Sequence, residues 1–104
     1  MKAFPEFSGF EWDEANREKS WRRHRVSWWE CEETFFNQPL YVVPDQEHSA
    51  TENRFYSLGR THNHRLLFVV FTRRNSRVRI ISARDMSKKE RKVYLEKAQK
   101  DSEI

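Results

Sequence analysis

The longest run of apolar residues in this chain covers residues 66–71 and reads Leu-Leu-Phe-Val-Val-Phe. Six residues are far short of the ~20 that a membrane-spanning helix needs. A short apolar run rich in β-branched and aromatic residues is typical of a central strand covered on both faces. The chain is therefore expected to fold around a β-sheet with this segment near its middle.

Turn residues flank this run and predict the neighbouring strands. The segment Arg-Asn-Ser-Arg at residues 74–77 predicts a tight hairpin, because asparagine tolerates a positive φ angle. A strand over residues 78–83 follows from it. Further short strands are expected over residues 10–13, 40–43 and 54–60.

Three helix starts complete the pattern. Asp13 is placed to cap a helix over about residues 14–24. Serine and glutamate at capping-box spacing open a second helix from residue 28 to about 37 and a third from residue 88 to about 99. This order predicts an α+β domain with one antiparallel sheet of four to five short strands, two N-terminal helices and one C-terminal helix, all packed on one face.

The length of 104 residues suits one domain, and fifteen aromatic residues supply the buried area that a small core needs. We expect a flexible arm over residues 1–8, a single domain over residues 9–99 and a tail over residues 100–104. The single cysteine excludes an internal disulfide, and the first residues lack the apolar stretch of a secretory signal. These features predict a cytoplasmic protein with no membrane association.

The charge is divided unevenly along the chain. Residues 1–52 hold 6 Lys and Arg against 11 Asp and Glu, whereas residues 53–104 hold 14 against 5. Five arginines crowd the final hairpin, and strand alternation places Arg77 and Arg79 opposite Val78 and Ile80. Arginine forks bind phosphate oxygens in pairs, so this face is expected to meet a polyanion. The alternative is a solvated face of weak salt bridges.

No glycine-rich phosphate loop, Cys/His metal spacing or nucleophile elbow is present, so we expect no metal and no cofactor. RNA supplies its own nucleophile, the 2′-hydroxyl. Its attack on the adjacent phosphate needs only a base, an acid for the leaving group, and cations around the developing charge. Arg, His, Glu and Tyr suffice for that chemistry, and Trp12, Tyr56 or Tyr94 would stack on bases unless they are buried in the core.

Four blocks of the chain resemble the BrnT-type toxins. They are residues 10–13 with Asn16 and the segment 24–28; residues 45–49; Glu52-x-Arg54 with Leu58-Gly59; and residues 79–84 followed by Glu90-Arg91-x-x-Tyr94. The resemblance implies a RelE-like fold and a metal-independent endoribonuclease that inhibits translation. It also implies a BrnA-type ribbon-helix-helix antitoxin, with operator DNA bound only through the toxin–antitoxin complex, and a homodimer or hetero-oligomer as the assembly.

The matching positions define the candidate site. Phosphate binding is assigned to Arg79 and Arg84, and proton transfer to His24, Glu52 or Tyr94, with Arg54 completing the catalytic candidates. Additional RNA contacts are expected from basic residues of the same half, namely Arg60, Arg73, Arg77, Lys88 and Arg91. Where the family usually has glycine after the histidine, this chain has Arg25, which puts the position of His24 in question.

Two other functions fit the same features. One is a non-catalytic basic domain that binds nucleic acid or an acidic protein. The other is a degenerate toxin that keeps only its antitoxin interface.

Overall fold

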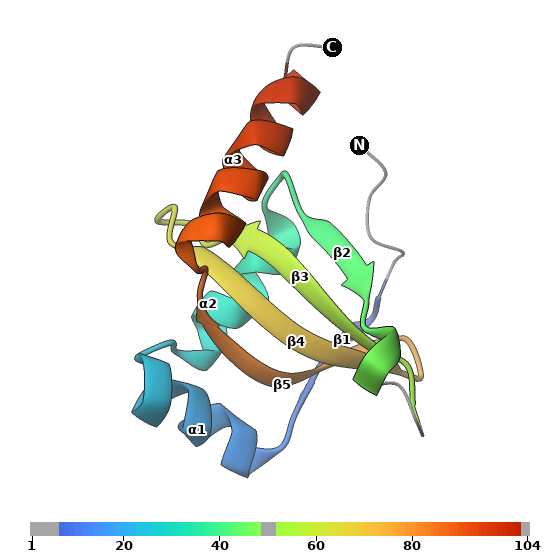
Figure 1. The fold of residues 1–104 in the computed structure, drawn as a ribbon. Coiled ribbons are helices and arrows are strands. Elements are labelled where there is room, and N and C mark those ends of the chain that lie inside the picture. The colour runs from blue at the N-terminus through green and yellow to red at the C-terminus, as the bar shows by residue number, and fades with distance from the viewer. Residues whose placement is uncertain (1–6, 49–51, 103–104) are drawn as a thin grey trace.

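The computed structural model describes residues 7–48 and 52–102, which form one sheet flanked by helices (Figure 1). In chain order the elements are β1 (Gly9–Trp12), α1 (Glu14–His24), α2 (Trp28–Glu33), the 3-10 helix η1 (Thr34–Phe36), β2 (Tyr41–Pro44), the 3-10 helix η2 (Gln46–His48), β3 (Arg54–Arg60), β4 (Leu66–Arg74), β5 (Arg77–Asp85) and α3 (Lys88–Ser102). Every expected strand and helix is present, with bounds that differ by a few residues.

The five strands lie in the order β1-β5-β4-β3-β2, which confirms that the apolar run lies in the central strand. The expectation of a purely antiparallel sheet is wrong, because β1 pairs with β5 in parallel, with Phe10 opposite Val78. Most of the chain separates these two strands, so no tight turn forces them to run antiparallel. The sheet is therefore mixed.

The hairpin between β4 and β5 forms as expected. Asn75 and Ser76 have φ angles of 50° and 63°, which is the pattern of a two-residue turn with both central residues left-handed. This turn sets Arg74 opposite Arg77 and fixes the register of the two longest strands. An extra residue in β5 opposite Val70 and Phe71 produces a bulge.

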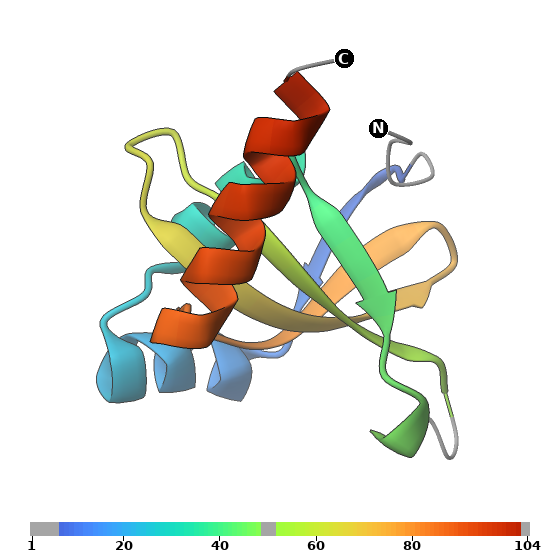
Figure 2. The ribbon, with the colours of Figure 1, turned by 45° about the horizontal axis from the view of Figure 1, so that its top comes forward.

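One face of the sheet carries the main core. Val78 and Ile80 of β5 and Phe71 of β4 are fully buried there, against Cys31 of α2 and Phe35 of η1. The alternation predicted for the arginine-rich strand is thus confirmed, since its valine and isoleucine face inward. The helix α2 lies on this side of the sheet, whereas α1 lies along the outer edge of β5 (Figures 1 and 2).

The helix α3 lies on the opposite face, so the prediction of helices on one face only is wrong (Figures 1 and 2). It covers one end of that face through a second cluster of Leu58, Met86 and Tyr94. The four-residue step from Glu90 to Tyr94 to Ala98 gives α3 a narrow stripe of buried or half-buried residues, which covers part of the sheet but not all of it. The rest of this face stays open.

Local hydrogen bonds explain the helix ends. The Asp13 carboxylate accepts from the amide of Ala15 at 3.0 Å, and the Ser87 amide donates to Glu90 at 2.8 Å while the Glu90 amide donates back to Ser87 at 3.2 Å. The second helix is shorter than expected, because it passes into η1 at Thr34. Residues 1–6 of the expected arm and 103–104 of the expected tail lie outside the described residues, whereas Phe7 packs on the Phe10 ring at 5.1 Å.

Candidate active site on the open sheet face

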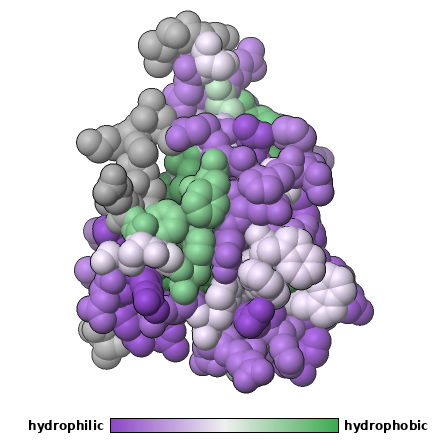
Figure 3. All heavy atoms as spheres, turned by 180° about the vertical axis from the view of Figure 1, so that it is seen from behind, coloured by the Kyte–Doolittle hydropathy of each residue, from purple (hydrophilic) through white to green (hydrophobic). Residues whose placement is uncertain are grey.

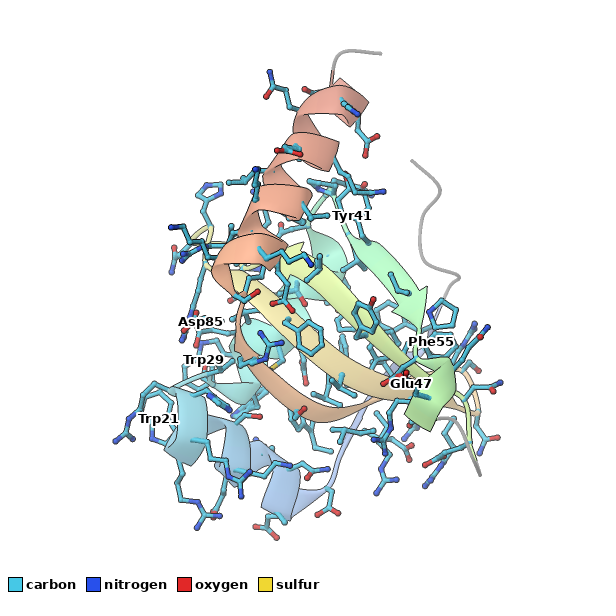
Figure 4. All side chains as sticks on the ribbon, viewed as in Figure 1. Trp21, Trp29, Tyr41, Glu47, Phe55 and Asp85 are labelled. Carbon is cyan, nitrogen blue, oxygen red and sulfur yellow. The ribbon has the colours of Figure 1, made fainter. Side chains whose placement is uncertain are left out.

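The open face is the side of the sheet opposite α2, and Figure 4 looks directly onto it. Strand register places its side chains in three rows that cross the strands. The first row is Glu11, Arg79, Thr72 and Arg54; the second is Ser82, Val70, Tyr56 and Val43; the third is Arg84, Phe68, Leu58 and Tyr41. The first row, named the arginine row here, lies toward the hairpin, and the third lies toward α3.

The arginine row brings together two of the predicted catalytic residues, Arg79 and Arg54. Arg79 and Arg54 both face Thr72 across neighbouring strands. Thr72 is fully buried, and its Oγ1 has no hydrogen-bond partner. A second buried oxygen without a partner, Oε2 of Glu11, lies beside Arg79 on β1. Unsatisfied buried polar atoms cost free energy, and in native proteins they are concentrated where a ligand or water completes the site.

Glu52 approaches the same row from the loop before β3. One of its oxygens accepts from Nη2 of Arg74 at 3.1 Å, and the other lies 3.8 Å from Nη1 of Arg79. A third carboxylate, that of Asp13, lies 3.8 Å from Nη2 of Arg79. The Glu52 side chain is 39% exposed, so water weakens these contacts and the carboxylate can exchange partners. A carboxylate beside guanidinium groups combines a group that can accept a proton with cations that can stabilise negative charge.

An aromatic platform fills the middle of the open face. The ring of Tyr56 stacks on that of Phe68 with centroids 5.3 Å apart and planes at 27°. Both rings are partly exposed. Flat, partly exposed rings on a sheet are the surface on which unpaired bases stack.

Arg84 closes the other end of this platform. Its guanidinium lies over Phe68, 4.1 Å from the ring centroid, and donates to both oxygens of Glu90 at 2.8 and 3.0 Å. These hydrogen bonds raise the pKa of Arg84 and lower that of Glu90. Glu90 therefore has two roles, as the cap of α3 and as the clamp that orients Arg84.

The structure separates the predicted phosphate-binding residues into two places. Arg79 and Arg84 are five residues apart on β5, which corresponds to roughly 15 Å along a strand. Their guanidinium groups also have different partners, because Arg79 lies near Glu52 and Arg84 donates to Glu90.

His24 lies near Arg84 rather than near Glu52. His24 and Arg84 both line a pocket between α1 and β5, and Glu52 does not. It is the last residue of α1, and Arg25 after it has the left-handed backbone that a glycine takes at this position, with φ 55° and ψ 37°. The replacement of glycine by arginine therefore leaves the helix end in its usual form.

Arg65 holds this helix end in place. Its guanidinium donates to the carbonyls of His24 and Arg25 at 3.2 and 2.8 Å, to both oxygens of Asp85, and to Glu30. The hydrogen bonds from Arg65 lower the pKa of Asp85. Sequence reasoning did not select Arg65, because a lone arginine after a turn carries no pattern that separates it from a solvated residue.

Tyr94 and Arg60 lie at a third location. Tyr94 is a residue of α3, and its side chain is buried against Leu58 and Met86. Its hydroxyl donates to the Pro39 carbonyl at 2.7 Å. Burial raises the pKa of Tyr94. Arg60 donates to the Gln38 carbonyl at 2.7 Å, so the structure places this pair against the segment before β2.

The remaining basic candidates lie at several separate places. Arg77 lies beside Arg74 at the hairpin, and register places Arg73 on the opposite side of β4. Lys88 and Arg91 lie exposed in the first turns of α3. Sequence reasoning also missed Phe68, since the alternation within an unbroken apolar run gives no sign of which residues face outward.

A second hollow lies between α1 and α2. It measures about 620 Å³ and is lined by Trp21, Trp28 and Trp29, which are 38–53% exposed. These rings form the pale patch over the two helices in the view from behind (Figure 3). The guanidinium of Arg17 lies 4.7 Å from the Trp28 ring and partly covers it.

No group of three or more His, Cys, Asp or Glu side chains is placed to hold a metal ion within residues 7–48 and 52–102. None of the helices in that part of the chain is long and apolar enough to cross a membrane.

Comparison with known proteins supplies the family context. The model of the family described as ribonuclease toxin, BrnT, of type II toxin–antitoxin system matches residues 12–90. This span includes Glu52, Arg84 and all of the arginine row except Glu11. Among solved structures, the chain is similar to the crystal structure of the Brucella abortus ribonuclease toxin, BrnT. The TM-score is 0.59 at 20% identity, over 77% of this chain and 97% of that one, which shows a common fold. No curated protein matches the chain.

Proposed function

This chain belongs to the BrnT family of ribonuclease toxins of type II toxin–antitoxin systems, and from that premise we propose that it cleaves single-stranded RNA on the open sheet face. The observation that carries this proposal is the position of Glu52 beside Arg79 and Arg74, at the end of an exposed platform of stacked aromatic rings. One surface thus offers a base, cations for a phosphate, and a place for bases to stack.

The proposed reaction uses the 2′-hydroxyl of the RNA as nucleophile. The Glu52 carboxylate takes the proton of that hydroxyl, and the oxygen attacks the neighbouring phosphorus. The bond from phosphorus to the 5′-oxygen breaks, and that oxygen takes a proton from water. The products are a 2′,3′-cyclic phosphate and a 5′-hydroxyl end, and no metal or cofactor takes part.

Arg79 and Arg54 have the electrostatic role in this scheme. The negative charge that develops on the phosphorane oxygens lies over the arginine row, where Arg79 and Arg54 are the neighbours of Thr72 on the two adjacent strands. Preorganised cations at the point where charge develops are usually the largest contribution to such catalysis. Tyr94 has no proton-transfer role in the proposal, because its hydroxyl is committed to the Pro39 carbonyl.

The family also implies an antitoxin partner. We propose a BrnA-type ribbon-helix-helix antitoxin that covers the open face, and operator DNA bound only through that complex. The toxin would act in the cytoplasm, where cleavage of RNA inhibits translation and growth.

Expression of the chain without a partner tests this function. We expect growth arrest with loss of cellular RNA, and Glu52→Gln should relieve the arrest at equal protein level. Retardation of intact RNA by the purified wild-type chain, weakened by salt and without fragments, would instead establish a non-catalytic basic domain.

A further inference from the structure

A pocket separate from the arginine row lies between α1 and β5 and has a volume of about 230 Å³. It exists because β1 ends at Trp12, which pairs with Ile80. Within the described part of the chain, no strand pairs with the outer edge of β5 beyond that point, and α1 packs there instead. The pocket is lined by Lys19, Ser20, Arg23, His24, Phe68, Ser82, Ala83 and Arg84.

The lining is cationic. Lys19 and Arg23 are four residues apart, so they share one face of α1. Arg84 lies opposite on β5, and His24 completes the helix side. The lining contains no aspartate or glutamate. Two carboxylates beside this lining are already engaged, since Glu90 pairs with Arg84 and Asp85 with Arg65.

A buried hydroxyl in the same lining has no partner. Ser20 is 1% exposed, and its Oγ makes no hydrogen bond. A hydroxyl in the middle of a helix ordinarily donates to a carbonyl of the preceding turn or faces water. An unpartnered hydroxyl among cations is suited to donate to an anion.

The volume limits what this anion is. Sites for drug-sized ligands measure about 300–1,000 Å³, and one water takes about 30 Å³ of liquid. A pocket of 230 Å³ holds a phosphate group with a few waters, but not a whole nucleotide. Its floor includes Phe68, so it adjoins the aromatic platform.

We propose that this pocket is a phosphate subsite that anchors the RNA strand at a phosphodiester other than the one cleaved. The inference rests on the proposed function for its substrate. It assigns Lys19, Ser20 and Arg23 to RNA binding, none of which takes part in the chemistry at Glu52. Arg79 and Arg84 lie roughly 15 Å apart along β5, a separation over which one RNA strand can place a different phosphate at each.

Titration of the isotope-labelled full chain with inorganic phosphate tests the pocket alone. We expect saturable changes in the amide spectrum that are centred on residues 19–24 and 82–84. Arg23→Ala should weaken this binding by about five-fold or more. Arg22→Ala is the matched control. Arg22 is the neighbour of Arg23 on α1 and has the same charge, but it lines the hollow between α1 and α2 that contains Trp21, Trp28 and Trp29.

A 2′-O-methylated RNA oligonucleotide, which lacks the nucleophile, distinguishes an RNA phosphodiester from free phosphate. It should perturb the same amides, and inorganic phosphate should reverse that effect. Ser20→Ala should weaken both ligands by a few-fold and leave the unfolding temperature unchanged or higher, since it removes an unsatisfied polar group.

Equal effects of the Arg22 and Arg23 variants on both ligands would overturn the proposal, as would the absence of a saturable phosphate response. Binding of inorganic phosphate without any response of these amides to the oligonucleotide would also overturn it, because the pocket would then serve free phosphate. The cleavage function is judged separately: it fails if wild-type protein leaves RNA intact, whatever the pocket binds.

Discussion

The guanidinium of Arg84 lies over the ring of Phe68, 4.1 Å from its centroid, while Glu90 accepts hydrogen bonds from both terminal nitrogens of Arg84. Arg84 is therefore held in one orientation before RNA binds. The ring of Tyr56 also stacks on the ring of Phe68. The three side chains form a rigid surface, and rigid aromatic surfaces bind bases with little loss of conformational entropy.

Replacement of Tyr56 by leucine tests this surface. Leucine keeps the apolar contact with Phe68 but has no flat ring, and base stacking contributes about 1–3 kcal/mol. We expect about ten-fold weaker binding of a 2′-O-methylated RNA oligonucleotide, measured by fluorescence anisotropy. Phe55→Leu is the control, because Phe55 is the adjacent residue on β3 and stacks on Phe71 on the opposite face. Its affinity should be unchanged; weakening by both variants alike would contradict the assignment.

Arg65 should be important for stability. Its hydrogen bonds connect the end of α1, the start of α2 and the end of β5. With the side chain 27% exposed, we expect Arg65→Gln to cost about 2 kcal/mol, or a fall of roughly 10 °C in unfolding temperature. Arg74→Ala, which removes an exposed pair with Glu52, should cost less than about 0.5 kcal/mol. Calorimetry of both variants measures the difference, and similar losses would show that Arg65 is only a surface charge.

Acid should destabilise the fold through the same contacts. Hydrogen bonds from Arg65 and Arg84 lower the pKa values of Asp85 and Glu90 in the folded protein. A carboxyl whose folded pKa lies below its unfolded value contributes stability that is complete above about pH 5 and is lost as the pH falls through the folded value. The unfolding temperature should therefore fall between about pH 5 and pH 3. Arg65→Gln should make this fall smaller, and an equally steep fall would show that Asp85 is not the titrating group.

Arg25 offers a test of local backbone strain. A non-glycine residue in the left-handed region costs about 1 kcal/mol, and Arg25 recovers part of this through its contact with the Trp21 ring at 5.4 Å. Arg25→Gly should therefore be more stable than Arg25→Ala by about 1 kcal/mol in urea unfolding. Equal stability of the two variants would mean that the helix ends differently in solution.

Local signals in the sequence predicted most of the fold. The caps at Asp13 and Ser87, the hairpin at Asn75 and the alternation around Val78 each depend on neighbours within a few residues, and the structure confirms all four. The parallel pairing of β1 and the placement of α3 on the opposite face were predicted wrongly. Both depend on contacts between segments far apart in the chain, such as Phe10 with Val78.

The sequence pattern selected the candidate residues but did not predict how the fold arranges them. Arg79, Arg54 and Glu52 do meet at one end of the open face. His24 and Arg84 meet at the other, because the length of β5 separates residues that are close in the sequence pattern. The roles of Phe68 and Arg65 depend on register and on a three-way junction, neither of which leaves a periodic signal.

Cleavage of a single-stranded RNA oligonucleotide by purified protein in EDTA tests the central claim most directly. The wild-type chain should produce fragments that end in a 2′,3′-cyclic phosphate. Glu52→Gln and Arg79→Ala should each slow cleavage by at least about 100-fold while circular dichroism stays native, and Arg22→Ala should cleave at the wild-type rate. Undiminished cleavage by Glu52→Gln and Arg79→Ala, or intact RNA with the wild-type protein, would contradict the account.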